Sequence, residues 1–163
     1  SQRITHMKRL KDAGESVAYL FETAAVLGAK LGPVFFQLPP FSKKDLSRLV
    51  SFLEVLPPGR PVAFEFRNES WFDGEVYDAL RAKGAALCAA DTDESGDEGA
   101  PIVPTANWGY LRLRRAEYSD QDLLGWANKV RAQAWERAFV FFKHEDAGKG
   151  PALAARFRAI LGA

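Results

Sequence analysis

The chain has 163 residues, 47% of them hydrophobic and 26% charged, which is the ordinary composition of a globular protein of one domain. Its 22 basic and 21 acidic residues leave a formal net charge of +1, so the composition gives no general attraction to nucleic acid or anionic membranes. The single cysteine, Cys88, excludes an internal disulfide, and its apolar surroundings predict a packing role. A membrane-spanning helix needs about 18 consecutive apolar residues, and no apolar run in the sequence is nearly that long. The N-terminus also lacks a signal-peptide pattern, so we expect a cytoplasmic protein.

Helical and strand patterns alternate along the whole chain. The first half is predicted to contain a helix over 13–31, a strand over 34–38, a helix capped by Ser42, a strand over 62–67 and a helix from Asp73 to Gly84. The second half is predicted to contain strands over 86–90, 108–113 and 139–142, with one helix opened by a capping box at Ser119 and a last helix opened by Pro151. Strands that alternate with helices at this spacing indicate a parallel sheet with helical crossovers.

The two faces of the predicted strands distinguish a barrel from an open, doubly wound sheet. Glu65 and Arg67 share one face of their strand, while its other face is apolar. Tyr110, Arg112 and Arg114 likewise share one face. An open sheet covered by helices on both sides would be apolar on both faces. We therefore predict an α/β fold of the TIM type, with the polar face toward the lumen and the apolar face toward the helices.

The number of strands predicts an incomplete barrel. About five strands are present where a closed barrel needs about eight, so the first strands should be missing. We expect residues 1–163 to form a single domain whose sheet has two open edges and an open lumen. Such a domain should self-associate, or require the N-terminal segment that would supply the missing strands.

Several motifs resemble one known family. They lie in residues 4–10, 31–40, 64–71, 106–113 and 141–146, and they include Gln37-Leu38-Pro39-Pro40 and Phe64-Glu65-Phe66-Arg67. In these segments the chain is similar to the YecE-like family, also called domain of unknown function 72. The resemblance implies a TIM-type β/α barrel of roughly 250 residues, in which this chain corresponds to strands four to eight. It implies no particular activity, substrate or cofactor.

Polar side chains gather at the predicted carboxyl ends of the strands, where barrel enzymes place substrate-binding groups. They are Gln37, Glu65, Arg67, Asp91, Arg112 and Arg114. Because an isolated buried charge is costly, we expect Glu65 to pair with an arginine. The other arginines would then bind a carboxylate or phosphate. The alternative is an internal ion-pair network that binds no ligand.

A second candidate anion site is the segment 143–151, between the last strand and the last helix. Glycines ahead of a helix expose backbone N–H groups, and the helix dipole adds positive potential, so Lys143 and Lys149 are predicted to help bind an anion. Trp71, after the second strand, is predicted either to stack on a ligand or to pack in the core.

The sequence supports three functions and does not decide whether the protein is an enzyme. The first is binding of a small anionic or phosphorylated ligand, with Glu65 or His144 as the acid/base group if catalysis occurs. The second is a hydrolase or isomerase assisted by a divalent metal held by His144, Glu145 and Asp91. The third is a non-catalytic interaction module whose lumen charges are structural. The first is favoured, so no resident metal or cofactor is predicted, and no nucleic-acid partner.

Overall fold

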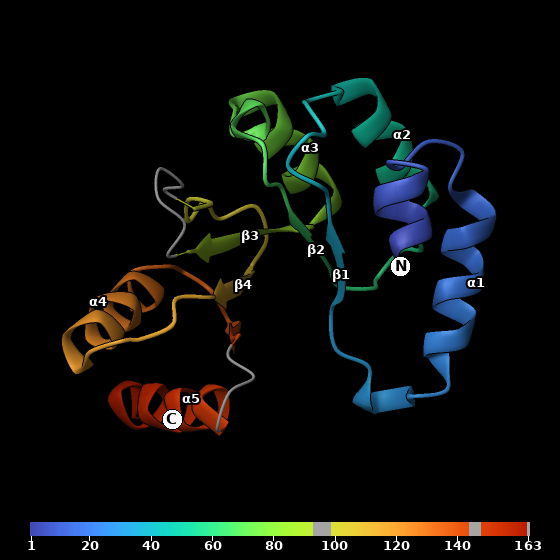
Figure 1. The fold of residues 1–163 in the computed structure, drawn as a ribbon. Coiled ribbons are helices and arrows are strands. Elements are labelled where there is room, and N and C mark those ends of the chain that lie inside the picture. Colours follow the sequence, from blue (N-terminus) through green and yellow to red (C-terminus); the bar gives the residue numbers. More distant parts are fainter. Residues whose placement is uncertain (93–98, 144–147, 163) are drawn as a thin grey trace.

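The computed structural model describes residues 1–92, 99–143 and 148–162, and Figure 1 shows its arrangement. Its five-stranded sheet comprises β1 (Val34–Gln37), β2 (Val62–Glu65), β3 (Ala86–Asp91), β4 (Trp108–Leu113) and β5 (Arg137–Phe142). Neighbouring strands are parallel, in the order β1-β2-β3-β4-β5. A doubly wound sheet reverses its strand order at a switch point, whereas the strands of a barrel follow one another in sequence. The observed order confirms the prediction of a barrel-type sheet.

Helices alternate with these strands. They are α1 (Gly14–Ala25), α2 (Leu46–Val55), α3 (Gly74–Lys83), α4 (Asp120–Arg131) and α5 (Lys149–Leu161), with short helical turns η1 (Arg3–Met7), η2 (Gly28–Lys30) and η3 (Glu69–Trp71). In Figure 1, α1 and α2 lie at the end of the sheet near β1, whereas α4 and α5 lie at the other end, near β4. Helices therefore flank the sheet near both of its ends, as in a β/α barrel.

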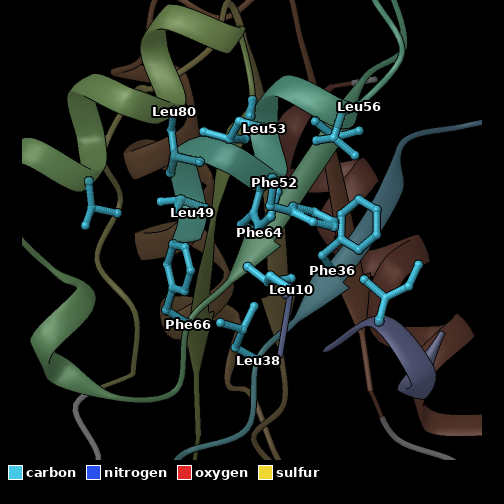
Figure 2. Close-up of a cluster of buried hydrophobic side chains, with 14 of the residues drawn as sticks. Leu10, Phe36, Leu38, Leu49, Phe52, Leu53, Leu56, Phe64, Phe66 and Leu80 are labelled. Carbon is cyan, nitrogen blue, oxygen red and sulfur yellow. The ribbon is translucent and has the colours of Figure 1, made fainter. Parts of the chain in front are cut away.

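The outer face of the sheet is the face packed against the helices. Phe36, Phe64 and Phe66 from β1, β2 and the residue after β2 contact Phe52 of α2 and Leu80 of α3 in one buried cluster, part of which Figure 2 shows. A second cluster joins the other end of the sheet to α4 and α5; its buried members are Leu113, Tyr118, Leu123, Ala127, Leu153 and Phe157. The apolar strand face is thus the helix-facing one, as predicted.

The opposite, inner face is lined by small side chains in the middle and large ones at the sides. Ala63 and Cys88 are buried here on β2 and β3. Above them the Phe35 and Tyr110 rings stack 5.1 Å apart at 7°, and the Phe141 ring lies 5.0 Å from Tyr110. Because the central side chains are small, aromatic rings from β1, β4 and β5 can meet across them.

Some of the predicted helix-capping residues cap their helices in the structure, and one does not. Asp73 caps α3, and Ser119 forms a capping box at α4, as predicted. Asp45, not Ser42, caps α2, because its carboxylate accepts the Arg48 N–H at 3.0 Å.

The end of α1 and the start of α5 differ from the predicted positions. The helix predicted over 13–31 ends at Ala25, and Gly28 then adopts a left-handed conformation (φ 52°) that a continuing α-helix does not allow. Pro151 lies within the first turn of α5 and not at its first position, since Gly148 is the N-cap.

The sheet ends in two strands that are paired on one side only among the described residues, β1 and β5. Unpaired strand edges are templates for further pairing. Phe141 on β5 is 47% exposed. We propose that residues 1–163 expressed alone associate through these edges, with a light-scattering mass above that of a monomer at high concentration. Phe141→Lys should reduce the association, because a charged side chain on an edge strand opposes pairing. A wild-type chain that stays monomeric would contradict this proposal.

Candidate functional site at the carboxyl ends of the strands

Glu65 lies at the end of β2 on the inner face and is only 1% exposed. Its Oε1 accepts a hydrogen bond from Gln37 Nε2 at 2.8 Å, and its Oε2 pairs with Arg112 Nη1 at 2.5 Å. The Arg112 guanidinium also lies over the Phe35 ring, 5.0 Å from its centroid. The structure thus confirms that Glu65 pairs with an arginine and that these side chains share the inner face. A catalytic role for Glu65 stays a prediction.

The titratable groups beside this pair are held in their neutral forms. Burial, and secondly the charge of Glu65, raise the pKa of the Cys88 thiol well above its ordinary value. Burial first, and then Cys88, raise the pKa of Tyr110 to about 12. Cys88 is fully buried, so the structure supports the packing role predicted for it.

A pocket of about 650 Å³ opens next to Glu65, beyond the ends of β2, β3 and β4. It is lined by Glu65, Phe66, Arg67, Asn68, Glu69, Phe72, Ala90, Gly99, Ala100 and Arg114. Three of the predicted site residues, Glu65, Arg67 and Arg114, therefore line one cavity. Gln37 and Arg112 are not among the lining residues, but both donate hydrogen bonds to Glu65, which is.

Asp91 lies at the end of β3, as predicted, but its side chain does not share the inner face with Glu65 and Arg112. The register pairs Asp91 with Leu113, whose side chain lies in the outer cluster, and pairs Ala90 with Arg112. Because successive side chains of a strand point to opposite faces, Asp91 faces the helix layer. Its Oδ1 accepts hydrogen bonds from the Tyr118 hydroxyl at 2.6 Å and from the Arg114 backbone N–H at 2.8 Å.

Trp71 is a core residue, so the prediction that it binds a ligand is wrong for this structure. Its side chain is 1% exposed and stacks on Phe66, with centroids 4.5 Å apart and an interplanar angle of 7°. Its Nε1 donates a hydrogen bond to the carbonyl of Ser42 at 2.7 Å. The packing alternative is therefore the correct one.

The segment before α5 is only partly described. His144 and Glu145, the predicted acid/base group and metal ligand, lie outside the described residues. Lys143 is exposed, and Lys149 forms an ion pair with Glu117. In the described ranges no group of three or more His, Cys, Asp or Glu side chains is placed to hold a metal ion. Nor is any helix in these ranges long and apolar enough to cross a membrane.

Among the residues that shape the site and that the sequence argument missed are Asn68 and Tyr118. Asn68 lines the pocket and fixes the turn after β2, because its Nδ2 donates to the Pro40 carbonyl at 2.8 Å and its Oδ1 accepts the Ser70 N–H at 3.2 Å. An Asn beside a strand end with Ser two residues on is a turn signal that could have indicated this role. Tyr118 gave no such signal, since its partner Asp91 is 27 residues away.

Together the sequential parallel strands, the outer helix layer and the polar pocket at the strand ends define a partial β/α barrel. The family model described as protein of unknown function DUF72 matches residues 1–163, and the chain belongs to this family.

Relatives of known structure have the same fold. The chain superposes on a DUF72 family protein from Thermotoga maritima MSB8 with a TM-score of 0.85 and 23% identity, covering 100% of this chain and 72% of that one. For a DUF72 family protein from Enterococcus faecalis V583 the TM-score is 0.77 with 16% identity, covering 94% and 67% of the two chains. The UPF0759 protein YunF of Bacillus subtilis (strain 168) is 25% identical over 123 residues, which is 72% of this chain and 43% of YunF. The chain therefore spans less than half the length of that relative.

Proposed function

We propose that this chain binds a small anionic ligand, such as a carboxylate or phosphate compound, in the pocket beyond β2, β3 and β4. The observation that carries the proposal is the placement of Arg67 and Arg114 in the wall of one cavity at the carboxyl ends of parallel strands. Ligand sites of β/α barrels are found at this end. A volume of about 650 Å³ also falls within the usual range of small-molecule pockets.

The charge balance of the pocket supports an anion as the ligand. Glu65 lines the pocket, but its carboxylate is already paired with Arg112 and hydrogen-bonded to Gln37. The Glu65 carboxylate is therefore engaged with other side chains and does not neutralise the Arg114 guanidinium. Glu69 is exposed, so solvent and salt weaken its effect on a ligand.

Arg114 is the residue best suited to bind the anion directly. Its Nε donates to the carbonyl oxygen of Asp91 at 3.3 Å, which holds one edge of the guanidinium against the end of β3. The Nη groups then form the fork that matches two oxygens of a carboxylate or phosphate. The guanidinium of Arg112, by contrast, is engaged with Glu65 and Phe35.

The proposal is tested by calorimetric titration of the chain with inorganic phosphate, pyrophosphate and citrate at constant ionic strength. Arg114→Met should weaken binding by about tenfold or more, because a hydrogen bond to a charged group contributes roughly 1.5–3 kcal/mol. Arg158→Met is the matched control: Arg158 is exposed on α5, and the same change there should leave the affinity nearly unaltered. Absence of wild-type binding to all three anions, or equal binding by Arg114→Met, would overturn the proposal.

A further inference from the structure

We infer that Asp91 and Tyr118 form a latch that positions Arg114 in the pocket; this inference rests on the proposed anion site. Arg114 follows the last residue of β4, where the sheet no longer fixes the backbone. Something else must therefore hold its side chain toward the cavity. The Asp91 carboxylate and the Tyr118 hydroxyl are the groups that contact this turn.

The latch holds the two peptide N–H groups on either side of the Arg114 Cα. Asp91 Oδ1 accepts the Arg114 N–H at 2.8 Å and the Tyr118 hydroxyl at 2.6 Å. The Tyr118 oxygen in turn accepts the Arg115 N–H at 3.0 Å. Two successive backbone donors are thus bound by two side chains that are themselves hydrogen-bonded to each other.

Asp91 also orients the Arg114 guanidinium. The Asp91 carbonyl oxygen accepts a hydrogen bond from Arg114 Nε at 3.3 Å. Asp91 is the last residue of β3, so these bonds tie the Arg114 main chain and side chain to the neighbouring strand. Arg114 is therefore positioned by an element that belongs to the barrel sheet, and not by its own loop.

Tyr118 is rigidly placed for this role. It is 4% exposed, and its ring meets Phe142 edge-on with centroids 5.7 Å apart. The Arg115 guanidinium lies 5.1 Å from the ring centroid. Burial and the hydrogen bond to Asp91 raise the pKa of the Tyr118 hydroxyl, which therefore remains a protonated donor at neutral pH.

Burial of the Asp91 carboxylate is energetically unfavourable, and packing alone does not explain it. Its Oδ2 is buried and has no hydrogen-bond partner among the described residues. A buried acceptor left unsatisfied is unfavourable, and such a group calls for a reason. Without the Tyr118 hydroxyl, the carboxylate would be free to turn toward the Arg114 guanidinium, where it would compete with an anionic ligand.

The test compares Tyr118→Phe with Tyr77→Phe, which removes a hydroxyl from a half-buried tyrosine on α3. Tyr118→Phe should weaken phosphate binding about tenfold, and Tyr77→Phe should not. Arg114 Hε exchange, followed by NMR on the protein without ligand, should become several-fold faster in Tyr118→Phe, while exchange of the backbone N–H groups that pair β3 with β4 stays unchanged. Loss of general stability would speed exchange at all of these positions.

Asp91→Asn provides a second variant and a double-mutant cycle. Asparagine keeps the acceptor oxygen but has no charge to compete with the ligand, so Asp91→Asn should bind phosphate at least as well as wild type. Tyr118→Phe should then have a smaller effect in that background. Unchanged Arg114 Hε exchange in Tyr118→Phe, or equal effects of Tyr118→Phe in both backgrounds, would overturn the latch. If wild type binds none of the three anions, the anion proposal fails, and Hε exchange alone decides the latch.

Discussion

Replacing Trp71 by alanine should lower the free energy of unfolding by about 4 kcal/mol, the middle of the range for large aromatic residues removed from a core. The indole is 1% exposed and stacked on Phe66, so its removal leaves a cavity that the neighbouring rings cannot fill without moving. The Ser42 carbonyl also loses its N–H donor. Urea unfolding at one fixed protein concentration measures the change.

Two variants make the Trp71 result interpretable. Phe41→Ala removes an aromatic side chain that is 68% exposed, and it should change the free energy by no more than about 0.5 kcal/mol. Trp71→Phe keeps a ring against Phe66 but lacks the N–H, so its loss should lie between the two. If Trp71→Ala were nearly neutral for stability while abolishing ligand binding, the assignment of Trp71 to the core would be wrong.

Glu65→Gln should lower the free energy of unfolding by about 3 kcal/mol, because breaking a buried ion pair leaves an uncompensated charge. The Glu65 side chain is 1% exposed and that of Arg112 only 19%, so water can solvate the stranded guanidinium only in part. This places the expected loss at the lower end of the range for buried pairs. The measurement is again urea unfolding at one protein concentration.

Glu54→Gln is the control for Glu65→Gln, since Glu54 is exposed on α2 and the same change there should be nearly neutral. Adding Arg112→Met to Glu65→Gln removes the stranded charge. The double variant should therefore be more stable than Glu65→Gln alone. A Glu65→Gln loss no larger than that of Glu54→Gln would show that the pair is well hydrated, and that burial does not strengthen it.

The candidate site was predictable where polarity alternated along a strand. Glu65 and Arg112 each stand between apolar neighbours, so the period of two placed both on one face, and they form an ion pair there. Asp91 follows Ala86 to Ala90, a run in which both faces are apolar. That run carries no contrast between faces, so only the register with β4 showed that Asp91 faces the helices.

The sequence alone determined the order of elements, the parallel sheet and the inward turn of the polar strand face, because hydrophobic period and helix caps are local properties of the chain. Only the tertiary structure decided which strand-end residues share a cavity. Arg114 meets Asp91 from 23 residues away, and Tyr118 meets it from 27 residues away. Such contacts depend on strand register and on the path of each turn through space. Local hydrophobic patterns in the sequence reveal neither the register nor the path.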